Sequence, residues 1–402
     1  MHRPRPIRRR ASPRRRVSDA RVNERVLAAL AGVIDPEIRK PITELDMVDS
    51  VTVADGHATV GIRLTIAGCP AAARIEADVL HAAESVTGVG NATVEVTVMT
   101  REQRQALTEK LRGGAAARSN PFGPDSLTRV YAVTSGKGGV GKSTITANLG
   151  VALAHRGLRV GIIDADVYGF SIPGLLGLVD TSVGGSRLAV KPTQVGEMIL
   201  PPVAHDVKVI SIGMFIDDPA AAVAWRGPML HRTISQFLTD VYFGDLDILL
   251  LDLPPGTGDV AISVGQLLPH ADVLVVTTPQ PAAADVAERS GIVARQTGQS
   301  IYGVIENMSG LPQSDGSVLD LFGSGGGAEV ARRLSAGQDS PVPVLAQVPL
   351  SVSLRSGGDA GTPVVLSDPT DPAAVAIQAV AQRLATRARG LAGLSLGISP
   401  RI

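Results

Sequence analysis

A glycine-rich segment near the middle of the chain follows directly on an apolar run. The run is Val130–Thr134, and the next ten residues, 135–144, read SGKGGVGKST. They match G-x-x-x-x-G-K-[ST] in the strand, loop and helix context that this pattern requires, because a helical stretch, Ser143–His155, comes next. Glycines let the backbone curl closely enough to aim its N–H groups at a polyphosphate. We therefore predict a phosphate-binding loop whose helix adds its positive end to the attraction.

The loop and a later apolar run together predict a nucleotide and Mg²⁺ site. Lys142 is expected to reach the β- and γ-phosphates, and Ser143 to ligate Mg²⁺. The run Ile248–Leu251 delivers Asp252 to a strand end, where its carboxylate would meet Mg²⁺ through water. Gly256, in the PPGTGD that follows, is expected to offer its N–H to the γ-phosphate. The predicted nucleotide-binding residues of the loop are Gly136, Lys137, Gly138, Gly139, Val140, Gly141, Lys142, Ser143 and Thr144.

Seven apolar runs without alternation follow Thr128, and longer helical stretches separate most of them. They are VYAVTS, VGIID, VKVISIG, ILLLDLPPG, VLVVTTP, IYGVIENMS and PVLAQVPL. Continuous runs of this kind are typical of strands that helices cover on both faces. Residues 128–387 are therefore predicted to form a three-layer α/β domain with a mostly parallel sheet. Ligands of such sheets lie at the carboxyl ends of the strands, where the motifs fall.

The part of the chain before this domain has a different pattern. Residues 19–111 predict a small α+β domain, and 112–127, rich in Gly, Ala, Pro and Ser, a linker. Residues 1–18 hold eight Arg and no acid, which predicts a disordered basic arm, and 388–402 read as a tail. The expected elements of the small domain are helices Val22–Val33 and Ala71–Ser85 and strands Val51–Ala54, Ala58–Ile66 and Ala92–Met99.

Several stretches resemble known families. GKGGVGKST, with its early Lys137, resembles the deviant Walker A motif of the MinD/ParA group. Six further segments resemble the Mrp (ApbC-like) family of iron–sulfur cluster carrier ATPases. They are DADVYGFSIP, WRGPM at 225–229, LDLPPGTGD, TTPQ at 277–280, ENMS and FGSGGG at 322–327. DPEIRKPI at 35–42 and LTIAGCP at 64–70 resemble the SufT-like domain that bacterial members carry.

The resemblance implies roles for individual residues and an assembly. Lys137 would reach the partner's nucleotide across a homodimer, Asp166 would orient the attacking water, and Asn307 would read adenine. Asp164 is left as a support for the loop or metal shell, or as a helix cap. The residues alone do not separate ATP from GTP; the resemblance implies ATP.

The cysteine content differs from that of the cluster-carrying members of the family that this sequence resembles. Cluster-carrying members place a C-x-x-C between ENMS and the glycine run, and one pair from each subunit holds a bridging cluster. Residues 310–321 contain no cysteine here, and thiolates are the ligands that iron–sulfur clusters select. Only Cys69 is left, which we interpret either as a weak iron–sulfur or target-contact ligand or as a small apolar residue that opens a helix.

These observations lead to one expected function and two rivals. We expect a cytoplasmic, Mg²⁺-dependent ATPase that acts as a homodimer and loads iron–sulfur clusters onto apo-proteins with assembly factors. The first rival is a nucleotide-gated adaptor that holds no cluster, and the second is a ParA-like positioning ATPase. A single cysteine excludes an internal disulfide. The sequence has no run of about 18 uncharged apolar residues, the pattern that would predict a membrane-spanning helix. We expect neither membrane nor nucleic acid as a partner.

Overall fold

The computed structural model describes residues 13–112, 120–180, 188–216, 227–313, 315–336, 338 and 340–387. These residues form two compact units. The first contains the chain up to Arg112 together with Thr193–Leu200, and the second contains the rest. Within the described residues, no helix has the length and apolar character needed to cross a membrane.

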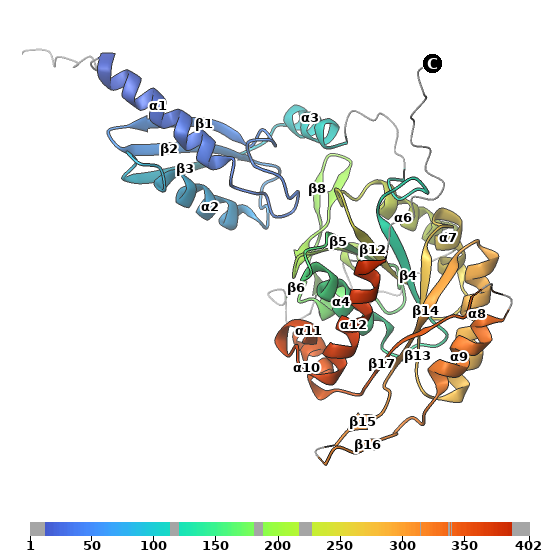
Figure 1. The fold of residues 1–402 in the computed structure, drawn as a ribbon. Coiled ribbons are helices and arrows are strands. Elements are labelled where there is room, and N and C mark those ends of the chain that lie inside the picture. The colour runs from blue at the N-terminus through green and yellow to red at the C-terminus, as the bar shows by residue number, and fades with distance from the viewer. Residues whose placement is uncertain are drawn as a thin grey trace, which may run out of the picture. The chain divides into compact units, whose positions relative to one another are not determined.

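The first unit is a three-stranded sheet packed against two helices (Figure 1). The strand order is β1 (Val48–Ala54), β2 (His57–Leu64), β3 (Asn91–Val98), with β1 antiparallel and β3 parallel to β2. Asp55 and Gly56 have φ of 54° and 78°, the left-handed values that a tight two-residue hairpin turn needs. The helices are α1 (Pro13–Leu30) and α2 (Ala72–Glu84), which bury an apolar stripe against the sheet.

Two features of this unit differ from the expectation. Helix α1 begins at Pro13, so residues 13–18, expected in the disordered arm, are helical, while residues 1–12 lie outside the described residues. A helix that is already anchored by Val22, Val26 and Leu30 extends at little cost into residues such as Arg. A further helix, α3 (Arg101–Leu111), was missed.

A short hairpin also belongs to this unit, although its sequence lies within the predicted α/β domain. It consists of β8 (Thr193–Val195) and β9 (Met198–Leu200). Thr193 donates its hydroxyl hydrogen to Glu37 Oε1 at 2.9 Å, and both side chains are buried. The hairpin is therefore part of the core of the small unit.

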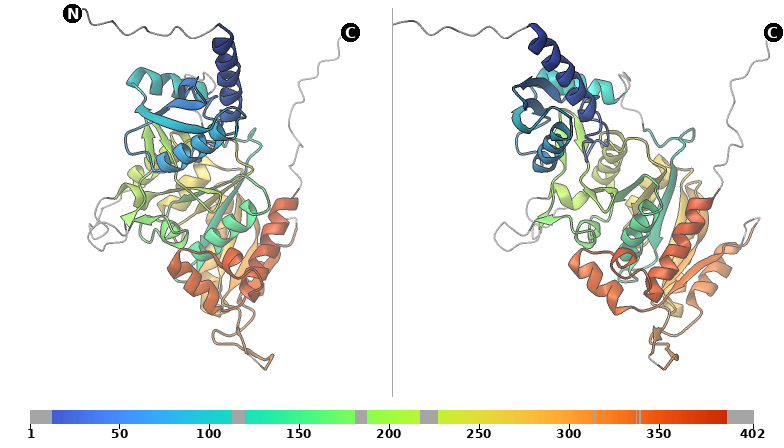
Figure 2. Two further views of the ribbon diagram at one scale, coloured as in Figure 1. Left: turned by 90° about the vertical axis from the view of Figure 1, so that its left-hand side faces the viewer. Right: turned by 60° about the vertical axis from the view of Figure 1, so that its left-hand side comes forward.

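The second unit confirms the predicted three-layer α/β fold (Figures 1 and 2). Its sheet has the order β10-β11-β5-β12-β4-β13-β14-β17, and only the edge strand β10 is antiparallel to its neighbour. The strands are β4 (Arg129–Ser135), β5 (Val160–Asp164), β10 (Val203–Ala204), β11 (Val207–Ser211), β12 (Ile248–Asp252), β13 (Asp272–Thr277), β14 (Ser300–Asn307) and β17 (Val344–Val348).

Helices cover both faces of this sheet (Figure 2). One face carries α4 (Lys142–Ala154), α5 (Ile172–Leu175), α10 (Val352–Ala360), α11 (Val364–Ser367) and α12 (Pro372–Thr386). The other carries α6 (Gly227–Thr239), α7 (Asp259–Leu267), α8 (Pro281–Gln296) and α9 (Gly326–Ser335). The remaining short elements are β6 (Val179–Asp180), β7 (Leu188–Ala189), a 3₁₀ turn (Ile212–Phe215), β15 (Leu311–Pro312) and β16 (Val318–Leu319).

The sheet register brings the predicted site together. Strands β5, β11 and β12 are buried at every position, as expected of strands covered on both faces. Asp252 at the end of β12 pairs in register with Asp164 of β5 and lies beside Val133 of β4. The phosphate-binding loop follows β4 at the same edge, so the two acids and the loop meet there.

Candidate functional site

The loop between β4 and α4 needs glycine at both of its ends. A Cβ on Gly136 would lie 2.3 Å from the backbone nitrogen of Ala287 in α8, so only glycine permits this approach. Gly141 has φ of 81°, and a Cβ there would lie 2.3 Å from Asn307 Nδ2. The loop is thus shaped by α8 on one side and by the end of β14 on the other.

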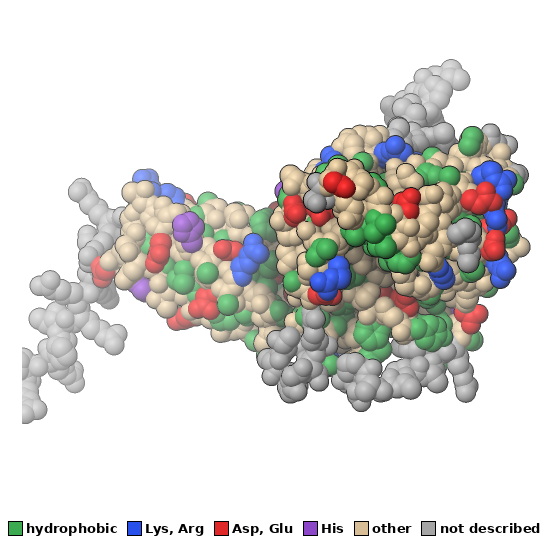
Figure 3. Space-filling view, turned by 90° about the horizontal axis from the view of Figure 1, so that it is seen from below, with side chains coloured by type: hydrophobic (Ala, Val, Ile, Leu, Met, Phe, Trp, Pro, Cys, Tyr) green, Lys and Arg blue, Asp and Glu red, His purple; other side chains and the backbone are tan. Residues whose placement is uncertain are grey.

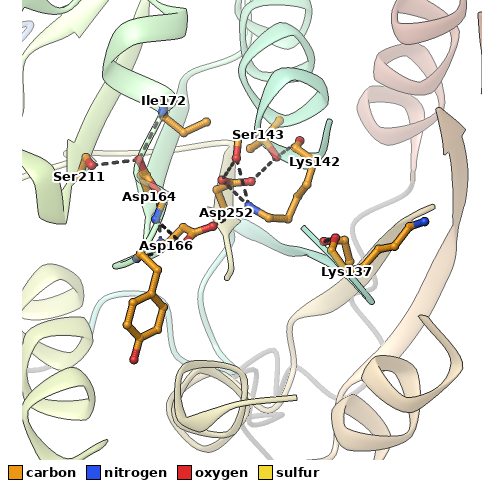
Figure 4. Close-up of polar contacts among 12 residues, drawn as sticks. Lys137, Lys142, Ser143, Asp164, Asp166, Ile172, Ser211 and Asp252 are labelled. Atoms are coloured by element: carbon orange, nitrogen blue, oxygen red, sulfur yellow. Dashed lines mark hydrogen bonds and ion pairs between the residues drawn. The ribbon is translucent and has the colours of Figure 1, made fainter. Parts of the chain in front are cut away.

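Asp252 is the centre of a buried polar cluster (Figure 4). Its Oδ2 accepts hydrogen bonds from Lys142 Nζ at 2.6 Å and Ser143 Oγ at 2.5 Å. Its Oδ1 accepts one from Thr146 Oγ1 at 2.8 Å. The predicted phosphate lysine, magnesium serine and magnesium aspartate therefore lie in direct contact, and Thr146, one helical turn after Lys142, is a member that the sequence analysis missed. The sequence signal for Thr146 was its position four residues after Lys142, which places both side chains on the same face of the predicted helix.

The two acids of the DAD segment have different environments. Asp164 Oδ2 accepts hydrogen bonds from Ser211 Oγ at 2.9 Å and from the Ile172 N–H at 3.3 Å. Burial first, and the charge of Asp252 second, raise the pKa of Asp164 to about 8. Asp166 Oδ1 accepts the N–H groups of Tyr168 and Gly169, and its Oδ2 lies 3.7 Å from Lys142 Nζ. Burial also raises the pKa of Asp166.

Lys137 lies apart from this cluster. Its Nζ donates to Gln280 Oε1 at 2.6 Å, and in Figure 4 its side chain points away from Asp252. The Gly256 N–H, predicted to meet the γ-phosphate, donates to the carbonyl of Ser135 at 2.8 Å. Gly256 is thereby tied to the strand that leads into the loop.

Asn307 and Glu306, at the end of β14, connect the loop to a neighbouring helix. Asn307 Nδ2 donates to the carbonyl of Val140 at 2.9 Å, while its buried Oδ1 has no partner among the described residues. Glu306 Oε2 accepts the Gly327 N–H at the start of α9 at 2.5 Å, and its Oε1 accepts from Ser309 and Gln347. The position of the loop is therefore linked, through β14, to α9.

The donors at Asp252 and Ser143 suit Mg²⁺. This ion is held in proteins by one or two carboxylates together with phosphate oxygens and waters. Asp252 and Ser143 already share a hydrogen bond at 2.5 Å, so a carboxylate and a hydroxyl oxygen stand side by side at the start of α4. Lys142 balances the Asp252 charge in this arrangement. The residues therefore fit the ion that the sequence analysis predicts.

Comparison with known proteins identifies the family. Residues 126–385 match the family described as NUBPL iron-transfer P-loop NTPase, and residues 23–96 match the iron-sulfur cluster assembly protein family. A Mycobacterium tuberculosis protein named iron-sulfur cluster carrier protein is 55% identical over 384 residues, 95% of this chain and 98% of that protein. A Synechocystis protein of the same name is 39% identical over 362 residues, which cover 90% of this chain and 96% of that protein. The chain belongs to the iron–sulfur cluster carrier family of P-loop NTPases.

A solved structure is similar to part of this chain. It is a nucleotide-binding protein in complex with ADP from Archaeoglobus fulgidus, 35% identical, covering 58% of this chain and 86% of that one. The TM-score of the two structures is 0.45.

The only cysteine of the sequence lies far from this site along the chain, in the first unit. Cys69 is buried, and this burial is the main reason that the pKa of its thiol is raised to about 11. The negative charges of Glu37 and Asp35 raise this pKa further. Cys69 is therefore a protonated thiol at neutral pH, whereas thiolates bind metals. The segment between Ser309 and Phe322 forms the β15–β16 hairpin with exposed apolar side chains. Within the described part of the chain, no group of three or more His, Cys, Asp or Glu could hold a metal ion.

Proposed function

We propose that this chain is a Mg²⁺-dependent ATPase that carries or assembles iron–sulfur clusters for apo-proteins in the cytoplasm. The observation that supports it is the cluster of Lys142, Ser143 and Asp252 at the end of a glycine loop that follows a buried parallel strand. Family membership supports nucleotide hydrolysis in general.

Nucleotide binding would exchange partners within this cluster. Lys142 Nζ, now bonded to Asp252, would turn to the phosphates, because a polyphosphate carries more charge than one carboxylate. Asp252 and Ser143 would then hold Mg²⁺, which neutralises charge that develops on the phosphates during transfer. Asp166 Oδ2 lies 3.7 Å from Lys142 Nζ, which supports the proposal that Asp166 would orient a water beside the terminal phosphate. Phosphoryl transfer requires this kind of positioning and charge neutralisation.

Substitution of Lys142 tests the assignment. Lys142→Ala should abolish phosphate release from ATP, and an intact rate in that variant would refute the proposal. Lys191→Ala, which removes a lysine outside the loop, is the matched control and should keep the rate of the unmodified protein. Calorimetric titration with Mg²⁺ and ATP shows separately whether binding is lost.

One observation favours the adaptor that holds no cluster. Residues 310–321 have no cysteine, and Cys69 is buried with a raised pKa. Anaerobic reconstitution with iron and sulfide, followed by iron counting and absorption spectroscopy, distinguishes the two. Bound cluster that Cys69→Ser eliminates supports a carrier that uses Cys69. No bound iron in the folded, nucleotide-binding protein supports the adaptor.

The positioning ATPase has less support. Figure 3 shows acidic and basic side chains intermixed over the face that it presents, without a continuous basic stripe across either unit. Nucleic-acid binders need such a stripe, because phosphate neutralisation supplies most of their affinity. The Arg-rich residues 1–12 lie outside the described residues. DNA affinity that falls steeply with salt would support this function instead.

A further inference from the structure

A cavity of about 1030 Å³ lies entirely within the first unit, away from the nucleotide loop in sequence. It is bounded by the loop after β2, the end of β3, helix α3 and the β8–β9 hairpin. Ile66, Ala67 and Val98 form its apolar floor, and Gln194 and Gly196 of the hairpin line its far side.

The floor is apolar because core-facing side chains of β3 are left uncovered. Val96 and Val98 pair in register with Ile62 and Leu64, so all four point to the same face of the sheet. Ile62 and Leu64 are buried, yet Val96 and Val98 are 43% and 42% exposed. Strand β3 is the edge of its sheet and has no strand on its far side among the described residues. An apolar surface with a polar rim of this kind marks an interaction site.

Three arginines face this floor from α3 and its end. Arg101, Arg104 and Arg112 line the cavity, and none of them forms an ion pair with a described residue. Arg104 Nη1 donates to the Met99 carbonyl at 2.8 Å, which fixes it at the strand end. Arg112 Nη2 is buried without a hydrogen-bond partner among the described residues. A buried donor without a partner is destabilising, and a ligand oxygen there would supply the missing hydrogen bond.

The charge around the cavity narrows the class of ligand. Residues 13–112 hold thirteen Lys or Arg against fourteen Asp or Glu, so the described part of the chain up to Arg112 has almost no net charge, and four of the thirteen lie within Arg101–Arg112. Three arginines beside an apolar floor suit a short acidic segment better than an extended polyanion such as nucleic acid, which needs a continuous basic track. Glu109 and Glu197 also line the cavity; Glu109 accepts from Gln105 at 3.1 Å. The chain's own ends are unsuited, since residues 1–18 and 388–402 contain Arg and no acid apart from the terminal carboxylate.

We propose that this cavity binds a short acidic segment of a partner protein that also carries apolar side chains. Its carboxylates bind Arg101, Arg104 and Arg112, and an apolar side chain packs on Val98. Arginine forks bind carboxylates with two parallel hydrogen bonds, which favours Asp and Glu over isolated polar groups. The unit thereby acts as a docking module, and this holds whether or not a cluster is carried.

Fluorescence anisotropy on the full chain tests the proposal. The probe is a labelled peptide of repeated Asp-Glu-Leu. Its comparison ligands are the same peptide with Ser for Leu, the same with Lys for the acids, and a single-stranded oligonucleotide. We expect the Asp-Glu-Leu peptide to bind best and to weaken with salt. Arg101→Glu and Arg104→Glu together should weaken it at least about tenfold, the effect of about 1.4 kcal/mol.

Two variants give the matched controls. Lys110→Ala removes a cation from the same helix that is paired with Asp46 outside the cavity lining, and should leave peptide affinity unchanged. Val98→Ser should weaken the Leu peptide and not the Ser peptide. Circular dichroism and thermal unfolding equal to those of the unmodified chain show that each variant is folded. Unchanged affinity in the arginine variant, tighter binding of the oligonucleotide, or no peptide binding at about 1 mM would each overturn the proposal.

Discussion

At the scale of single residues, Asp164 is a carboxyl group with no exposure to solvent. Its pKa is raised from 3.8 to about 8, mainly by burial. Between about pH 4 and pH 8 the folded protein therefore keeps a proton on Asp164 that the unfolded chain has already released. The free energy of unfolding should fall as the pH rises through this range, because folding takes up a proton and that uptake becomes less favourable as the pH rises.

Asp164→Asn should flatten this fall, because the amide replaces the protonated carboxyl and has no charge to bury. Urea unfolding of the nucleotide-free protein in EDTA, repeated over that pH range, measures it. Asp245→Asn, at a side chain that is 92% exposed, is the control and should keep the original slope. Equal slopes for Asp164→Asn and the unmodified protein would show that Asp164 is ionised throughout.

Asn307 gives a second prediction at this scale. Its Nδ2 holds the Val140 carbonyl, so Asn307→Ala should weaken both ATP and GTP about fivefold, the value of one hydrogen bond of about 1 kcal/mol. Its buried, unpartnered Oδ1 can accept the amino hydrogens of adenine but not the carbonyl of guanine. We therefore expect ATP to weaken further than GTP. Calorimetric titration with each nucleotide decides it, and an unchanged ATP-to-GTP ratio would contradict the adenine role.

At the scale of secondary-structure elements, α3 depends on its first turn. Thr100 Oγ1 accepts the Gln103 N–H at 3.3 Å, and Gln103 Oε1 accepts the Thr100 N–H at 2.8 Å. Thr100→Ala removes half of this capping box and should lower the free energy of unfolding of the small unit by about 1 kcal/mol. Thermal unfolding measures the change. The control is Thr128→Ala, a substitution of the same kind outside α3. It should leave the unfolding of α3 unchanged, as measured by hydrogen exchange of the α3 amides.

The same helix shows what the sequence could and could not predict. The buried parallel strands were predictable because continuous Val, Ile and Leu runs have one stable environment, between two helical layers. Helix α3 is polar, and its signal was the Thr100–Gln103 pair rather than an apolar stripe. The β8–β9 hairpin was not predictable, since three-residue strands carry little periodicity and its place in the first unit depends on the non-local Thr193–Glu37 bond.

The predicted site residues follow the same division. Lys142, Ser143 and Asp252 meet because each is defined by its place at a strand end or helix start, and the sheet register then brings those ends together. Contacts made by flexible side chains were not predictable. The bond between Lys137 and Gln280, and the contact of Asn307 with the loop backbone, depend on side-chain directions that spacing does not encode.

At the scale of the whole molecule, Lys137 connects the single chain to its proposed assembly. Within one chain it is bonded to Gln280 and does not reach the Lys142 and Asp252 cluster (Figure 4). If Lys137 acts on the nucleotide of a second copy, turnover per chain should rise with protein concentration, and Lys137→Ala should remove that rise while leaving nucleotide binding to the monomer nearly unchanged. Gln280→Ala frees the lysine without removing its charge and should preserve the rise. Phosphate release measured across a dilution series checks this, and a Lys137→Ala protein whose turnover still rises with concentration would place the lysine's role within its own chain.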